Sequence, residues 1–244
     1  MTRAVPEAFR EDRSGNIPAM TDRAVGPDVS HFHPIVDMGR LLDTGVSFIG
    51  MKVSQGSSYV DPWFGRHLQL ARDAGDRLAA RLLYHFIEGG VDPVKQARRF
   101  MSLVGTPAPG DVLVGDVEER RAGDVVNPPP AIEEVEAFFS ELPASCRQAC
   151  YVSARIWSLI GNPTWARASE VGLWAPRYSD GAAEPALPRS AAGPVWPQWD
   201  FWQYSQGDAF PGVDGPADGN YFRGTSAELR AWALLRNPDG SVRA

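Results

Sequence analysis

Short strand-like segments alternate with helix-like segments along most of the chain, and this alternation constrains the fold more than any other feature. Candidate strands lie at residues 24–30, 47–54, 79–86, 112–119, 150–153, 171–174, 200–205 and 213–222. Candidate helices lie at residues 34–44, 61–75, 93–104, 130–141, 154–160 and 226–235. A repeated strand–helix unit of roughly 25 to 35 residues indicates parallel βα units.

The alternation fails at residues 178–198, which are rich in Pro, Gly and Ala and have no amphipathic order. We therefore expect a loop where the next helix would stand. A chain of 244 residues suits one α/β barrel, since such barrels need roughly 200 to 250 residues. We expect a flexible arm at residues 1–24, a barrel at 25–235 and a short tail at 236–244.

The bulk composition excludes several classes of protein. Hydrophobic residues make up 43% and charged residues 22% of the chain, as in ordinary soluble globular proteins. The net charge of −6 provides no basic surface for nucleic acid. No stretch is long and apolar enough to cross a membrane. Cys146 and Cys150 are so close in sequence that a bridge would constrain little, so we expect two free thiols.

The segment at residues 112–119 is an apolar run that ends in two acids, Asp116 and Glu118. Positions i and i+2 of a strand face the same side, and the C-terminal ends of barrel strands open onto the catalytic face. Two acids there suggest acid/base chemistry on a glycosidic bond. Asp28 occupies the same place in the first strand. An isolated Asp-x-Glu also arises by chance in a chain this acidic, so its context must decide.

Nine short segments supply that context, because in this order they resemble glycoside hydrolase family 25. These enzymes are lysozymes that cut bacterial peptidoglycan between N-acetylmuramic acid and N-acetylglucosamine. The resemblance runs from about residue 25 to residue 224, and it implies an irregular TIM-like barrel of eight strands with helices mainly after the first five. The segments are residues 26–30, 48–56, 84–86, 96–100, 116–118, 173–178, 202–205, 211–213 and 218–222.

The resemblance also implies roles for four acids. Glu118 matches the general acid, Asp116 matches the acid that handles the acetamido group of the substrate, and Asp28 and Asp218 match two further acids of the groove. The chain departs from the family at residues 31–34, which read His-Phe-His-Pro where the family usually has Gln-Gly. This loop borders the groove, so the departure bears on substrate preference.

The chemistry requires a neutral carboxylic acid to protonate the leaving oxygen. Carboxylates at Asp116 and Asp28 would raise the pKa of Glu118, because like charges close together are costly. The second acid has two options: it attacks the anomeric carbon directly, or it assists the acetamido group of the substrate. The resemblance favours assistance, with retained configuration.

Aromatic residues gather in the later strands and are candidates for stacking on sugar rings: Trp174, Tyr178, Trp199, Trp202 and Tyr204. Core packing is the alternative for each of them. We expect Trp174, Tyr178, Trp202, Tyr84 and Gln203 to bind substrate. His31, His33 and His85 do not supply the three or four converging ligands of a zinc site, so we expect neither metal nor cofactor.

The leading hypothesis is an N-acetylmuramidase that acts as a monomer on peptidoglycan glycan strands. The alternative is a catalytically inactive barrel that binds cell-wall glycan or a protein partner. The first 24 residues lack the apolar core of a signal peptide. We therefore expect an enzyme made in the cytoplasm that reaches the wall as a phage endolysin or virion-associated lysin. A secreted bacterial enzyme whose leader is missing is the alternative.

Overall fold

Eight strands close into a barrel in the computed structural model, which describes residues 22–123, 125–178 and 184–234. Around the barrel the order is β1-β13-β12-β9-β8-β5-β4-β2, and a parallel pairing of β1 with β2 closes the ring. Seven strands are mutually parallel, whereas β13 is antiparallel to both β1 and β12. The strands are β1 (Val25–Val29), β2 (Phe48–Gln55), β4 (Ala80–Phe86), β5 (Asp111–Asp116), β8 (Arg147–Tyr151), β9 (Gly172–Pro176), β12 (Phe201–Ala209) and β13 (Pro216–Phe222).

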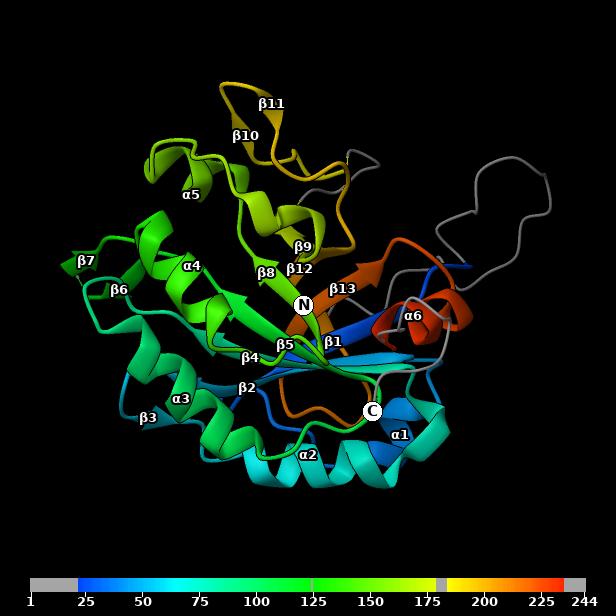
Figure 1. Ribbon diagram of the computed structural model, residues 1–244. Coiled ribbons are helices and arrows are strands. Elements are labelled where there is room, and N and C mark those ends of the chain that lie inside the picture. The colour runs from blue at the N-terminus through cyan, green and yellow to red at the C-terminus, as the bar shows by residue number, and fades with distance from the viewer. Residues whose placement is uncertain (1–21, 124, 179–183, 235–244) are drawn as a thin grey trace.

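Helices follow the first five barrel strands, as predicted (Figure 1). They are α1 (Met38–Leu42), α2 (Phe64–Asp73), α3 (Pro93–Val104), α4 (Ile132–Ser140) and α5 (Ala154–Leu159), with 3-10 turns at Gly75–Arg77 and Ala166–Ser169. After β9 a small hairpin of β10 (Arg189–Ser190) and β11 (Gly193–Pro194) takes the place of a helix. The predicted irregular barrel is therefore confirmed.

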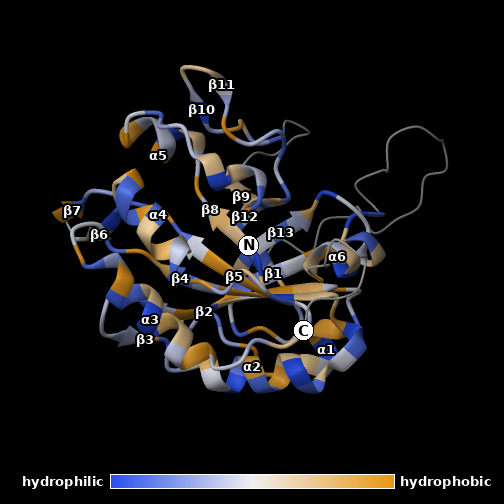
Figure 2. Cartoon of the chain, in the orientation of Figure 1, coloured by the Kyte–Doolittle hydropathy of each residue, from blue (hydrophilic) through white to orange (hydrophobic). Residues whose placement is uncertain are grey.

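Two hydrophobic cores lie on the two sides of the barrel wall. Alternate residues of β2 and β4 divide between them: Phe48 and Leu82 belong to the inner core, and Ile49 and Leu83 to the outer core beneath the helices. Figure 2 shows hydrophobic colouring on several barrel strands, and both hydrophobic and hydrophilic stretches on α2 and α3. The division of alternate strand residues between the inner and the outer core follows from the period of two in a strand.

The helix α6 (Ser226–Ala233) packs against the end of the barrel interior at which the parallel strands begin. Its Leu229 belongs to the inner core, and the Trp232 ring packs on Phe201 and Phe222. Phe201 begins β12 and Phe222 ends the antiparallel β13, so both lie at the end of the barrel opposite the C-terminal ends of the parallel strands. Within the residues that the structure describes, α6 therefore covers this end of the interior.

Several boundaries differ from the sequence prediction. The helix predicted at residues 34–44 begins only at Met38, because Ile35 pairs with Val213 and the Asp37 side chain caps the helix by accepting from the Arg40 amide. The strand predicted at residues 150–153 lies earlier, at Arg147–Tyr151. Three small hairpins escaped prediction because their strands are too short to show a period: β3 (Tyr59–Val60) on β2, β6 (Arg120–Ala122) with β7 (Val125–Asn127), and β10 with β11.

Other sequence predictions have mixed outcomes. Most of the predicted arm (residues 1–21) and the tail at 236–244 lie outside the described residues. Cys146 and Cys150 are free thiols, as predicted. Among the residues that the structure describes, no helix has the length and apolarity needed to cross a membrane.

Candidate active site

A cavity of about 280 Å³ lies where the C-terminal ends of the parallel strands meet. Asp116 ends β5, and Glu118 follows two residues later. The Val117 amide donates to the Tyr151 carbonyl at 2.9 Å, so the strand alternation continues past Asp116 and turns Glu118 to the same side. The cavity is lined by Asp28, Lys52, Tyr84, Phe86, Asp116, Glu118, Tyr151, Trp174, Tyr178, Gln203, Gln206 and Asp218. All four predicted acids are therefore brought together.

The amide of Gln203 holds two of these acids. Asp28 and Asp218 are direct partners across β1 and β13. Gln203 Nε2 donates to Asp28 Oδ2 at 2.9 Å and to Asp218 Oδ2 at 3.1 Å. Gln203 Oε1 accepts from the hydroxyls of Tyr151 and Tyr178, both at 2.7 Å. Both N–H donors and both acceptor positions of the Gln203 amide are thus occupied by protein groups.

A second amide, that of Asn220, supports the floor of the cavity. Asn220 Nδ2 donates to Asp28 Oδ2 at 2.8 Å, and Asn220 Oδ1 accepts from Trp174 Nε1 at 2.8 Å. Gly50 leaves room for this arrangement, since a Cβ atom there would lie 2.6 Å from Asp28 Cβ and 3.0 Å from the Trp174 ring. A glycine is therefore needed beside Asp28 for steric reasons.

The comparisons with known proteins agree with this geometry. The profile of "Glycosyl hydrolases family 25" matches residues 27–213. The chain belongs to this family. It is a glycoside hydrolase, as the sequence resemblance predicted.

This family 25 hydrolase has similar relatives in several bacteria. It is 27% identical to the uncharacterized protein YegX of Escherichia coli (strain K12) over 222 residues, which cover 85% of this chain and 72% of the relative. It is 27% identical to Lysozyme M1 of Streptomyces globisporus over 228 residues, 88% of this chain and 73% of the relative. The crystal structure of the lysozyme from Streptomyces coelicolor superposes with a TM-score of 0.73 at 26% identity, covering 87% of this chain and 98% of that one.

Burial dominates the electrostatics of the Asp28 and Asp218 pair in this hydrolase. It raises the pKa of Asp28 from 3.8 to about 6, although the hydrogen bonds from Asn220 and Gln203 oppose the shift. Burial and then the charge of Asp28 raise the pKa of Asp218 from 3.8 to about 8. The two carboxyls therefore hold protons at pH values where ordinary aspartates are ionised.

Asp116 and Glu118 are shifted in the same direction. Burial, followed by the charge of Glu118, raises the pKa of Asp116 well above its usual value. Asp116 Oδ1 is buried and has no hydrogen-bond partner within the described part of the chain, so no hydrogen bond stabilises a negative charge on that oxygen. Burial also raises the pKa of Glu118, which suits a proton donor, while Tyr151 opposes the shift as a hydrogen-bond partner. The Lys52 ammonium lowers the pKa of both acids.

Four of the five residues predicted to bind substrate line the cavity: Tyr84, Trp174, Tyr178 and Gln203. Trp202 is a correction to the prediction, because it does not line the cavity and lies in the outer core. Its indole Nε1 donates to the Arg177 carbonyl at 2.9 Å, and its ring packs on Trp199 and Tyr221. The physical reason is strand alternation: Gln203 faces inward, so its neighbour must face outward.

Sequence reasoning missed four residues of the cavity wall: Lys52, Phe86, Tyr151 and Gln206. The position of Lys52 could have been predicted, because it lies four residues after the inward-facing Phe48 on β2 and therefore faces the same side of the strand. A lysine at an inward position of an apolar strand is rare without a functional or structural partner. Within the described residues, Lys52 is the only basic side chain that lines the cavity.

The histidines serve other purposes. His85 faces away from the cavity and pairs with Ser54 and Gln96, and burial lowers its pKa to about 4. His31 binds Asp61 through Nδ1 at 3.0 Å. No group of three or more potential metal ligands occurs within residues 22–123, 125–178 and 184–234.

Proposed function

We propose that the protein is an N-acetylmuramidase that hydrolyses the β-1,4 bond between N-acetylmuramic acid and N-acetylglucosamine in peptidoglycan. The observation that carries the proposal is the convergence of Asp28, Asp116, Glu118 and Asp218 on one cavity in a family 25 barrel. The names of two relatives, Lysozyme M1 and the Streptomyces coelicolor lysozyme, support it.

In this mechanism Glu118 protonates the oxygen of the leaving sugar. Its raised pKa keeps a proton available at mildly acidic pH. Asp116 orients the acetamido group of the substrate, whose carbonyl oxygen attacks the anomeric carbon, and the carboxylate stabilises the positive oxazolinium intermediate. Glu118 then takes a proton from water, which opens the intermediate with overall retention of configuration.

Asp28 and Asp218 act on the opposite wall of the cavity. Gln203 and Asn220 fix the position of Asp28 before substrate arrives. With a pKa of about 6, Asp28 is partly ionised at mildly acidic pH and then favours the positive charge that develops at the sugar ring, with no rearrangement needed during the reaction. Asp218, with a pKa of about 8, stays protonated there and can donate a hydrogen bond. In this scheme Asp28 stabilises charge, Asp218 acts as a hydrogen-bonding group, and Glu118 and Asp116 carry out the proton and acetamido chemistry.

The test is digestion of purified peptidoglycan, with analysis of the new reducing ends after borohydride reduction. Muramitol ends are expected, and glucosaminitol ends would identify a glucosaminidase instead. Proton NMR of the first product should show the β-anomer, as retention requires, whereas the α-anomer would exclude substrate assistance.

Two variants accompany this test. Glu118→Gln should abolish the release of reducing ends. Glu119→Gln is the matched control, because Glu119 adjoins the same loop but pairs with Arg155 and does not line the cavity. Glycan binding without any new ends, in both wild type and control, would instead support the inactive barrel.

A further inference from the structure

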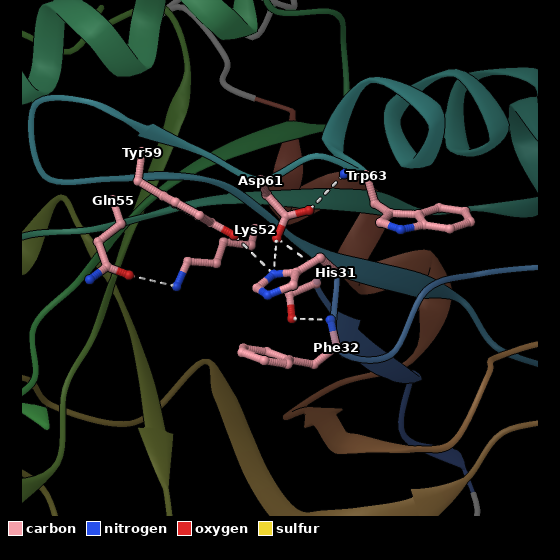
Figure 3. Close-up of polar contacts among 8 residues, drawn as sticks. His31, Phe32, Lys52, Gln55, Tyr59, Asp61 and Trp63 are labelled. Carbon is pink, nitrogen blue, oxygen red and sulfur yellow. Dashed lines mark hydrogen bonds and ion pairs between the residues drawn. The ribbon is translucent and has the colours of Figure 1, made fainter. Parts of the chain in front are cut away.

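The loop in which this chain departs from its family is fixed in place by one buried carboxylate. Asp61 Oδ2 accepts from the His31 amide at 3.0 Å and pairs with His31 Nδ1 at 3.0 Å. Asp61 Oδ1 accepts from the Trp63 amide at 2.9 Å. Figure 3 shows these contacts joining the loop after β1 to the segment after β3. The loop is therefore held rigidly, although it lies at the surface.

This anchored loop presents aromatic rings to solvent. Phe32 is 71% exposed and Tyr59 is 37% exposed. The Phe32 ring lies against the imidazole of His31, with centroids 3.9 Å apart, and the Tyr59 hydroxyl is 2.9 Å from His31 Nδ1. Large aromatic side chains that are exposed and held in place commonly mark binding surfaces.

The aromatic cluster is continuous with the catalytic cavity. Lys52 lines the cavity, and its ammonium lies 5.8 Å from the centroid of the Tyr59 ring. From Lys52 the contacts lead outward through Tyr59 and His31 to Phe32, as Figure 3 shows. A polymer that occupies the cavity and leaves it past Lys52 would meet these rings next.

Polar groups of the right kind accompany the rings. Lys52 Nζ donates to Gln55 Oε1 at 3.0 Å, and an ammonium has three donors. Within the described residues no other hydrogen bond of Lys52 Nζ is formed, nor any of His31 Nε2. Lys52 Nζ can therefore donate to hydroxyl or amide carbonyl oxygens of a ligand, and His31 Nε2, with the ring proton on Nδ1 facing Asp61, can accept from a ligand hydroxyl.

We propose that Phe32, His31 and Tyr59 form an outer sugar subsite, which binds a pyranose ring of the glycan strand beyond the sugars held in the cavity. The apolar C–H face of the pyranose stacks on Phe32, and His31 Nε2 and Lys52 Nζ bind its oxygen substituents. This inference rests on the proposed function, because it takes the occupant of the cavity to be a glycan strand.

The test compares substrates of different length. Peptidoglycan tetrasaccharide and octasaccharide are digested by wild type and by Phe32→Ala. We expect kcat/KM for the octasaccharide to fall about tenfold, chiefly through KM, and to fall much less for the tetrasaccharide. Phe32→Trp should preserve the wild-type ratio of the two values, since it keeps an aromatic face.

The control is Val36→Ala, which truncates another exposed apolar side chain close by in sequence, 52% exposed and outside the cluster. It should leave both values unchanged. Equal losses on the two substrates, or no loss on the octasaccharide, would overturn the subsite. If wild type cleaves neither substrate, the proposed function fails. Calorimetric titration of octasaccharide into wild type and Phe32→Ala then decides the subsite separately, and equal affinities would reject it.

Discussion

Asp28 and Asp218 face each other across two antiparallel strands, and a single amide nitrogen, Gln203 Nε2, donates a hydrogen bond to each. The two carboxyls are thereby held side by side. Because Gln203 Oε1 also accepts from Tyr151 and Tyr178, this glutamine fixes the positions of four side chains of the cavity. A direct role in sugar binding would require it to give up one of these bonds.

Replacing Gln203 should therefore impair catalysis more than binding. In Gln203→Met, both aspartates lose a donor and both tyrosines lose an acceptor. We expect kcat to fall about 10- to 100-fold with a smaller change in KM. Steady-state kinetics on soluble glycan measure both constants. Gln69→Met, on the surface of α2, is the control, and an effect confined to KM would contradict the positioning role.

Neutralising Asp218 should stabilise the fold at high pH. The pKa of Asp218 rises from 3.8 to about 8 on folding, so the folded state binds this proton more tightly than the unfolded state. The resulting stability is present below about pH 4 and is lost as pH rises towards about 8. Asp218→Asn should thus melt about 2 to 6 °C higher than wild type at pH 8 and about equally at pH 4. Calorimetry at the two pH values checks this, and a lower melting temperature at pH 8 would refute it.

Asp116→Asn should change both the rate and its pH dependence. Wild-type activity should follow a bell on the acidic side of neutrality, since it needs Glu118 protonated and Asp116 ionised. The variant lacks the negative charge next to Glu118, so the pKa of Glu118 falls and the alkaline limb moves to lower pH. The rate should fall by about 100-fold or more. A near wild-type rate with an unmoved alkaline limb would contradict the roles proposed for Glu118 as general acid and for Asp116 as the group that assists the acetamido group.

Lys52→Met should move the profile the other way. The Lys52 ammonium lowers the pKa of Asp116 and of Glu118, so its removal raises both and shifts the whole bell to higher pH. Lys52→Arg keeps the charge and should leave the profile close to that of wild type. The measurement is kcat/KM across the pH range. A shift of the profile to lower pH in Lys52→Met would show that another group sets the pKa values of its acidic and alkaline limbs.

Three of the four acids could be predicted from the strand segments that hold or adjoin them, whereas Asp218 follows only from the family resemblance. Asp28 and Asp116 lie at the ends of parallel strands, and Glu118 shares a face with Asp116. The outward position of Trp202 could also have been deduced, because it adjoins Gln203 on one strand and only one of two neighbours can face inward. The error came from treating aromatic character as stronger than alternation.

Other features depend on partners that are distant in sequence. Ile35 leaves the helical conformation because it pairs with Val213, and Asp61 fixes the His31 loop from the connection between β3 and α2. Asn220 joins the site through hydrogen bonds to Asp28 and Trp174. No local pattern signals such contacts, since they arise only when the barrel closes.

The antiparallel β13 has a consequence for the synthesis of the protein. β13 supplies Asp218 and is also the strand that joins β1 to β12, so the first and last barrel strands complete the ring together. A nascent chain that lacks residues 216–222 has neither the closed ring nor the fourth acid. Hydrolytic activity should therefore arise only after residues 216–222 have left the ribosome, and translation products that end before them should be inert.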